Sequence, residues 1–271
     1  LCFLDLDNLV PSDPAGMPVR LEHAVDRYFE RHPIESTSMG MIVPKDILTL
    51  ADRARRTARF RDVCLTGFVN LVDEKIEMQF SATTYLPGDG TAFVAFRGTD
   101  DTLVGWKEDF NMAYLFDTPG QKRAAEYLNE HFMNYDRPIR LGGHSKGGNL
   151  AVYAAVHAPV SVQKKIDSVW SNDGPGFYHD LQAKPEYAGV AGRITSIIPK
   201  SSVVGMLLEH EEDYIVVESS QVGLMQHDGF SWEVLGNSFV RLHGVTRQGR
   251  IHDLVLKEWV RNMSLPQREK F

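Results

Sequence analysis

The segment around residue 145 limits the possible folds of this chain more than any other. Pro138–Leu141 is predicted as a short buried strand, the pattern GHSKG follows at Gly143–Gly147, and Lys146–His157 has the composition of a packed helix. A Gly-x-Ser-x-Gly pattern between a strand and a helix is typical of a sharp turn that exposes its serine, with glycines where neighbouring backbone comes close. We therefore predict a strand–turn–helix unit with Ser145 at its tip; the alternative is a glycine-rich turn with an incidental serine.

The segments that flank this unit predict a mixed sheet. Upstream, Val63–Val72 and Ile76–Thr84 are predicted as an antiparallel pair, and alternating apolar and polar residues predict that the second strand is half-exposed. Ala92–Phe96 is apolar throughout, which predicts a strand buried on both faces. Downstream we predict strands over Lys165–Asn172, Arg193–Pro199 and Tyr214–Glu218, and a hairpin within residues 231–242.

Helices are predicted on either side of these strands. Apolar residues recur at helical spacing over residues 17–31, from Pro44 onward, over Gly120–Tyr135 and over Arg250–Met263. Helices that alternate with strands behind an antiparallel start predict an α/β fold with a mixed sheet and helices on both faces. We expect one domain over residues 1–271, with residues 1–62 as a helical cover and residues 63–271 as the core, because no linker or repeat divides the chain.

Composition and charge exclude several classes of protein. The net charge is −7 and no segment forms a basic patch, so we expect no nucleic-acid partner. The two cysteines, Cys2 and Cys64, cannot form a disulfide framework, which leads us to expect a reducing, cytoplasmic location. No apolar run approaches the roughly 18 residues of a membrane-spanning helix, so we expect no transmembrane segment. The sequence does not indicate an oligomeric state.

The same inspection gives no reason to expect a metal or a cofactor. The glycine-rich run Gly142–Gly148 is not followed by the Gly-Lys-Ser/Thr of a phosphate-binding loop. No two histidines share metal-ligand spacing with a nearby acid on one predicted helix. The chemistry of this chain is therefore expected to come from its own side chains.

Polar residues gather where the predicted strands end. Reactive groups of open α/β sheets lie beyond the carboxyl ends of the strands. The loops at five such ends hold Thr99, Ser145, Asp173, Ser202 and His227. A serine nucleophile needs a base within hydrogen-bond reach, a third group that orients the base, and donors that bind the oxyanion of the tetrahedral intermediate. These loops contain side chains of each required kind.

Ser145 is the predicted nucleophile of this constellation. The backbone N–H of the residue after the nucleophile, Lys146, is one predicted oxyanion donor. The second donor is predicted from Gly98-Thr99 at the end of an earlier strand, where glycine permits close approach and threonine offers both N–H and hydroxyl. A plain strand-end turn explains the same two residues, so this alternative stays open.

The base is predicted to be His227. It lies in the polar loop Met225–Gly229 after the last central strand, which fits the chain order serine, acid, histidine of this architecture. His252, at the start of the last predicted helix, is its rival. We expect His144, next to the serine, to be a packing residue.

The acid is the least determined of the predicted catalytic residues. The loop that follows the predicted strand Arg193–Pro199 ordinarily supplies it, but this loop contains Ser202 and no carboxylate. Asp173, one strand earlier, is the nearest strand-end acid and is our prediction. The alternative for Asp173 is a turn cap within Asp-Gly-Pro-Gly.

The motifs together resemble a known family. VAFRGT at Val94–Thr99, then Trp106 and Asp109, then GHSKGG at Gly143–Gly148 are similar to the class 3 (fungal-type) lipases of the α/β-hydrolase superfamily. The lysine in GHSKGG, with NDGPGF at Asn172–Phe177, resembles an uncharacterised bacterial branch of that family. The resemblance implies an α/β-hydrolase fold, Ser145 as nucleophile, Thr99 and Lys146 as oxyanion donors and His227 as base. The chain departs from the family where Ser202-Val203-Val204 replaces Asp-x-Val.

These observations predict a serine hydrolase that cleaves carboxylic esters through an acyl-enzyme, with an ester or lipid as substrate. Apolar residues between Trp106 and Phe116 are candidates to cover the site. The alternative is a degenerate hydrolase that serves as a binding or scaffold module, because the usual acid position holds Ser202.

Overall fold

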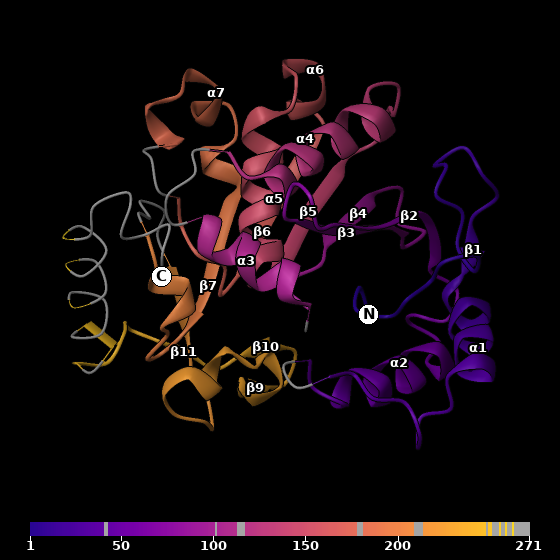
Figure 1. The fold of residues 1–271 in the computed structure, drawn as a ribbon, viewed down its shortest axis with the longest axis horizontal. Coiled ribbons are helices and arrows are strands. Elements are labelled where there is room, and N and C mark those ends of the chain that lie inside the picture. Colours follow the sequence, from indigo (N-terminus) through magenta and orange to yellow (C-terminus); the bar gives the residue numbers. More distant parts are fainter. Residues whose placement is uncertain are drawn as a thin grey trace.

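The computed structural model describes residues 1–271 except 41–42, 101, 113–116, 178–180, 209–213, 248, 251–254, 256–257, 259–261 and 263–271. Its described residues form a nine-stranded sheet in the order β1-β2-β3-β4-β5-β6-β7-β8-β11 (Figure 1). The strands are β1 (Val19–Arg20), β2 (Cys64–Asp73), β3 (Met78–Leu86), β4 (Ala92–Phe96), β5 (Ile139–His144), β6 (Ile166–Asn172), β7 (Ile194–Pro199), β8 (Tyr214–Val217) and β11 (Arg241–Leu242). β1 to β4 pair antiparallel, β4 to β8 pair parallel, and β11 returns antiparallel to β8.

Helices cover both faces of the sheet. The helices are α1 (Leu21–Arg31), α2 (Asp46–Arg56), α3 (Leu103–Asn111), α4 (Pro119–Phe132), α5 (Lys146–His157), α6 (Val160–Gln163) and α7 (Pro185–Ala188). α4 and α5 pack on the first face, where Tyr127 and Leu150 join a buried cluster with Phe96 and Leu141. α1 and α2 pack with residues 1–10 on the second face of the antiparallel strands. The predicted α/β fold with a mixed sheet and antiparallel N-terminal strands is therefore confirmed.

The helix that follows Ser145 is the most enclosed of these elements. Every residue of α5 from Lys146 to Val156 is buried. A helix that is apolar around nearly its whole circumference belongs in a core, and here it lies against α4 and the parallel strands. The first residue of α5 is a lysine, and its burial requires charged or polar partners inside the protein.

Two predictions about burial are wrong. The polar residues Gln79, Ser81 and Thr83 of β3 are fully buried, not exposed. Two sets of distant residues pack on this strand: Lys146 and Glu108 enclose Gln79, and residues 1–10 form a buried cluster on the face where Tyr85 packs. β4 is buried on one face only, since Phe93 and Ala95 are half-buried.

The predicted turns and helix ends agree with the structure more closely. The hairpin within residues 231–242 is formed by β9 (Val234–Leu235) and β10 (Ser238–Phe239), with Gly236 at a φ of 67°. α4 begins with a capping box between Thr118 and Gln121. The short helix α3 was not predicted. Most of the predicted closing helix, Arg250–Met263, lies outside the described residues.

Among the described residues, no helix combines the length and the apolar character needed to cross a bilayer.

A buried tyrosine links α4 to the neighbouring strands β2 and β3, and its removal provides a test of the fold. The hydroxyl of Tyr127 on α4 donates to Gly67 O at 2.6 Å and lies 2.9 Å from the Thr84 hydroxyl. Tyr127→Phe should lower the free energy of unfolding by about 1–2 kcal/mol, because it leaves the buried Gly67 carbonyl without a donor and the Thr84 hydroxyl without an acceptor. Urea unfolding measures this change.

Tyr135→Phe is the matched control, since the ring of Tyr135 is half-buried beside Phe132. A surface change of this kind should stay within about 0.5 kcal/mol of wild type. Equal effects of the two substitutions would contradict the role given to the Tyr127 hydroxyl.

Candidate active site

Ser145 lies in a strained turn between β5 and α5. Its φ is 58° and its ψ is −133°, a region that residues with a side chain rarely occupy. A Cβ atom on Gly143 would clash with the backbone of Gly147, and a Cβ atom on Gly147 would clash with the Phe96 carbonyl. Both glycines are therefore needed for three backbone segments to meet beneath the serine.

Asp173 and His227 form a hydrogen-bonded pair. Asp173 follows β6 at a φ of 50°, is fully buried, and its Oδ2 lies 2.7 Å from His227 Nδ1. The hydroxyl of Ser202 donates to the other carboxylate oxygen at 2.5 Å, and the Gly205 N–H donates to that hydroxyl at 2.9 Å. Ser202, at the position where an acid was expected, thus fixes the orientation of the acid that the neighbouring strand supplies.

The loop that carries His227 is attached directly to the serine turn. The ring of His144 stacks on the ring of His227 at a centroid distance of 4.5 Å, and its Nε2 lies 2.6 Å from the His227 carbonyl. Trp232 donates from its ring N–H to the Gln226 carbonyl at 2.8 Å. His144 was expected only to pack, but it also links the turn at Ser145 to the loop of the predicted base.

The Thr99 loop lies against the same turn. A Cβ atom on Gly98 would come within 3.3 Å of the Ser145 Cβ, so this glycine brings the loop next to the serine. The Thr99 hydroxyl donates to both carboxylate oxygens of Asp109, at 2.6 and 2.8 Å. The N–H of Thr99 has no acceptor among the described residues, and the N–H of Lys146 has none within its own helix because Lys146 is the first residue of α5. The backbone N–H groups of Thr99 and Lys146 thus lie near Ser145 without an acceptor in the described part of the chain.

Burial shifts the pKa of two groups around the serine. It raises the pKa of Asp109 to about 6, although the charge of Lys146 and the Thr99 hydrogen bond act in the opposite direction. It also lowers the pKa of His144 to about 4, and the charge of His227 adds to this effect. A carbonyl oxygen can only accept a hydrogen bond. The bond between His144 Nε2 and the His227 carbonyl therefore requires that neutral His144 carry its proton on Nε2.

Some residues near the serine could be found from the sequence only in part. Gln79 and Glu108 surround the Lys146 ammonium group and were not predicted. The sequence contains one indication of such partners, namely that a lysine begins a helix whose composition predicts burial. The rival base His252 lies outside the described residues. The described part of the chain contains no cluster of histidine, cysteine and acidic residues suited to a metal.

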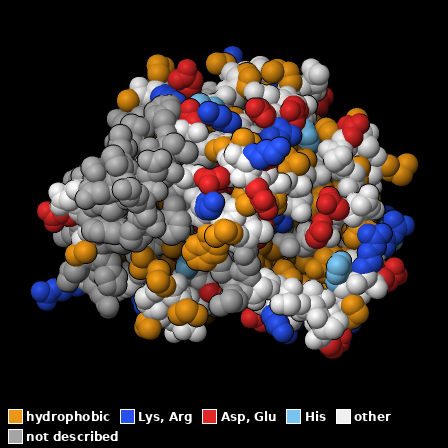
Figure 2. Space-filling view, in the orientation of Figure 1, with side chains coloured by type: hydrophobic (Ala, Val, Ile, Leu, Met, Phe, Trp, Pro, Cys, Tyr) orange, Lys and Arg blue, Asp and Glu red, His pale blue; other side chains and the backbone are white. Residues whose placement is uncertain are grey.

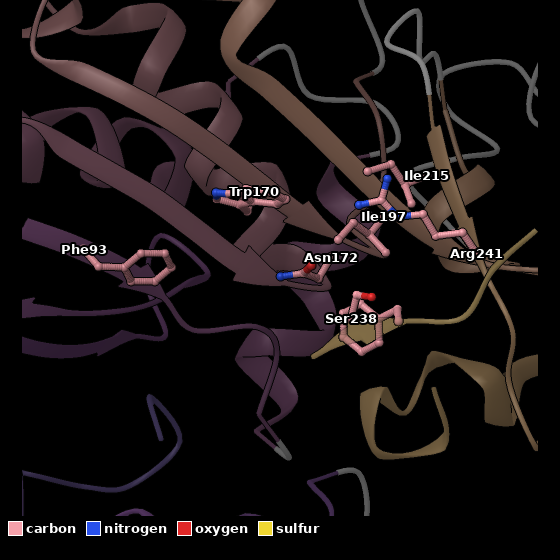
Figure 3. Close-up of a pocket in the computed structure, with 8 residues that line it drawn as sticks. Phe93, Trp170, Asn172, Ile197, Ile215, Ser238 and Arg241 are labelled. Atoms are coloured by element: carbon pink, nitrogen blue, oxygen red, sulfur yellow. The ribbon is translucent and has the colours of Figure 1, made fainter. Parts of the chain in front are cut away.

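An apolar groove opens on the second face of the sheet, where β4 is half-buried. It has a volume of about 350 Å³ and is lined by Phe93, Trp170, Asn172, Ile197, Ile215, Ser238, Phe239 and Arg241 (Figure 3). Asn172 immediately precedes Asp173 and donates to the Gly143 carbonyl at 3.2 Å. The groove therefore reaches the carboxyl end of β6, beside the acid.

Exposed apolar side chains flank the site on two elements. Leu103 and Trp106 project from α3, with 71% and 45% of their surface exposed. The segment that carries His227 exposes four more, namely Val222, Leu224, Met225 and Phe230. Figure 2 shows hydrophobic side chains over both regions of this face.

The buried state of His144 predicts a pH dependence of stability. The unfolded chain protonates this histidine near pH 6.5, whereas the folded protein does so only near pH 4. Between these values the unfolded state binds more protons, so the free energy of unfolding falls as pH falls. His144→Gln should flatten that decline. Urea unfolding at pH 7, 6 and 5 measures the difference from wild type.

Substitution of the exposed His23 by Gln is the control and should leave the slope unchanged. Burial also lowers the pKa of His131 to about 4, so His144→Gln should reduce the slope without abolishing it. A slope equal to that of wild type would contradict a buried, neutral His144.

Comparison with known proteins places this geometry in context. No curated protein matches the chain. A fungal lipase–inhibitor complex is similar with a TM-score of 0.43 and 14% identity over 58% of this chain and 67% of that chain. The Rhizomucor miehei lipase propeptide complex has a TM-score of 0.42 and 14% identity, and the match covers 58% of this chain and 57% of that chain. A triacylglycerol lipase from Penicillium expansum has a TM-score of 0.41 and 14% identity, and the match covers 68% of this chain and 75% of that chain. The chain thus spans little more than half the length of the Rhizomucor protein.

A family model gives the more extensive match. The model of the Mbeg1-like proteins covers residues 54–271, which include the serine turn, Asp173 and His227. The matched region contains the parallel strands β4 to β8 and the strained turn at Ser145. The chain belongs to the Mbeg1-like family.

Proposed function

We propose that this protein is a serine hydrolase that cleaves carboxylic esters through an acyl-enzyme. The observation that carries the proposal is the 2.7 Å hydrogen bond between His227 and the fully buried Asp173. His227 lies on a loop that His144 fixes to the serine turn. A buried carboxylate that holds one ring nitrogen of a histidine leaves the other nitrogen able to accept a proton.

The first half of the proposed reaction forms the acyl-enzyme. The bond to Asp173 keeps the proton on His227 Nδ1, so Nε2 accepts the proton of the Ser145 hydroxyl. Ser145 Oγ then attacks the ester carbonyl, and the N–H groups of Thr99 and Lys146 bind the oxyanion. His227 passes its proton to the departing alcohol as the tetrahedral intermediate collapses.

The second half releases the acid. A water molecule loses a proton to His227 and attacks the acyl carbonyl, and the same two N–H groups bind the second oxyanion. Collapse of this intermediate returns the proton to Ser145 Oγ and frees the carboxylic acid. Asp173 remains ionised throughout and stabilises the imidazolium that forms twice per cycle.

Apolar surface around the site supports an ester with an apolar acyl or alcohol group. α3 and the His227 loop, which contact the residues next to Ser145, carry exposed apolar side chains, and the groove lined by Trp170 reaches the end of β6. Exposed apolar surface next to a site indicates a hydrophobic ligand.

A non-catalytic binding module is the second candidate. Ser145 Oγ forms no hydrogen bond with another residue of the described chain, and this observation favours that candidate. Such nucleophile–base bonds are frequently long in free enzymes and shorten when substrate binds, so the hydrolase remains our proposal.

Labelling of the serine separates the two candidates. The purified protein should react with a fluorophosphonate probe and hydrolyse p-nitrophenyl butyrate. Ser145→Ala should abolish labelling and lower kcat by at least about 10⁴-fold, because the nucleophile itself is lost. Mass spectrometry of the labelled peptide and steady-state kinetics measure the two effects.

Ser161→Ala, at an exposed serine on α6, is the control and should behave as wild type. A wild-type protein that neither reacts nor hydrolyses the ester would refute the hydrolase proposal. Activity that survives Ser145→Ala would refute the assignment of the nucleophile.

A further inference from the structure

We propose that the side chain of Lys146 is a positioning group for the oxyanion hole, and that its buried ion pair with Glu108 makes α3 the support of that hole. The inference rests on the proposed hydrolase function and adds a role for three residues to it. Those residues are Lys146 on α5, Glu108 on α3 and Gln79 on β3.

The ammonium group of Lys146 is fully enclosed. Its side chain is 1% exposed, and Nζ donates to Glu108 Oε2 at 2.9 Å, Gln79 O at 2.9 Å and Gln79 Oε1 at 2.6 Å. An ammonium group has three protons, and here each has an acceptor. The side chain is therefore held in one geometry, and its backbone N–H is held with it.

Glu108 is equally well fixed. Its side chain is 0% exposed. Besides Lys146, it accepts the N–H of Gln79 at 3.0 Å and the N–H of Gly120, near the start of α4, at 2.6 Å. One carboxylate thus joins α3, β3, α4 and the residue that follows the nucleophile.

The next residue of α3 holds the other oxyanion donor. Asp109 accepts the hydroxyl of Thr99 at 2.6 and 2.8 Å. Two consecutive acids therefore fix the two residues whose N–H groups flank Ser145. A small displacement of α3 would move both donors relative to the serine.

The chemistry of the pair argues against a purely stabilising role. Desolvation of two charges offsets most of their attraction, so an apolar pair of similar volume is often as stable. A polar pair gives what an apolar pair does not, namely a directional bond that fixes one orientation. Such fixing matters most next to a group that must meet the transition state within a fraction of an ångström.

A double substitution separates positioning from stability. Lys146→Met and Glu108→Gln alone each leave an uncompensated buried group and should lower Tm strongly. Together they remove both charges, so Tm should recover part of the loss; the remainder reflects the single oxygen that an amide offers to the two backbone N–H groups bound by Glu108. If the pair positions the donors, kcat for p-nitrophenyl butyrate in the double variant should stay at least about tenfold below wild type, with KM changed by less than about threefold.

Inhibition by a trifluoromethyl ketone gives a second measurement. The ketone forms a tetrahedral oxyanion on Ser145, so its Ki should rise by the same factor by which kcat/KM falls. Gln79→Met is a milder probe that removes one acceptor of Lys146 and also a buried, unpartnered Gln79 Nε2. It should keep Tm near wild type while lowering kcat, and it decides the question if the double variant does not fold.

The control is an exposed ion pair between the same helix and the residue that precedes β3. Lys107 lies 3.2 Å from Glu77 with 51% and 36% of the side chains exposed, so Lys107→Met with Glu77→Gln should leave kcat and Ki at wild-type values. A folded double variant, or Gln79→Met, with wild-type kcat and Ki would overturn the inference while the hydrolase proposal stands. A wild-type protein without Ser145-dependent hydrolysis would overturn both.

Discussion

Close contact of three backbone segments at the end of β5 is the constraint on which the rest of the site depends. Gly143, Gly147 and the Phe96 carbonyl approach one another so closely that no side chain fits between them. This approach allows Ser145 a positive φ and lifts its hydroxyl above the sheet. It also brings the loop after β4 and the start of α5 to the same point, so the two predicted oxyanion donors follow from the backbone geometry that strains the serine.

The position of the acid shows how a site can keep its geometry when a residue moves along the chain. Neighbouring strands lie about 4.8 Å apart, and the end of β6 is bonded to β7 through the Asp173 N–H and the Ile197 carbonyl. A carboxylate after β6 can therefore reach a histidine that would ordinarily meet one after β7. Ser202 occupies the vacated position and donates to Asp173 at 2.5 Å, so the second carboxylate oxygen stays satisfied. A missing acid in the motif is thus not, by itself, evidence of a missing acid in the site.

How much could be predicted depended on whether the determinants are local or distant in the chain. The bounds of α5 were predicted from composition, and the hairpin at Gly236 from a turn signal, because adjacent residues fix both. The burial of β3 was mispredicted because residues 1–10, distant in the chain, form a buried cluster against Tyr85 of this strand, and no local pattern indicates that contact. The contact between Ser202 and Asp173 joins two loops that are 29 residues apart. Glu108 was not predicted, because the only reason to expect an acid there is the burial of the Lys146 ammonium group.

The pairing of Asp173 with His227 is the central claim, and the proton between them tests it most directly. In ¹⁵N-histidine-labelled protein, NMR should show a low-field Nδ1 proton of His227, as expected for a hydrogen bond to a buried carboxylate. Asp173→Asn should abolish this resonance, whereas Ser202→Ala should shift it and leave it visible, because the Ser202 hydroxyl bonds the other carboxylate oxygen and not the one that holds His227. A low-field proton that persists unchanged in Asp173→Asn would contradict the account.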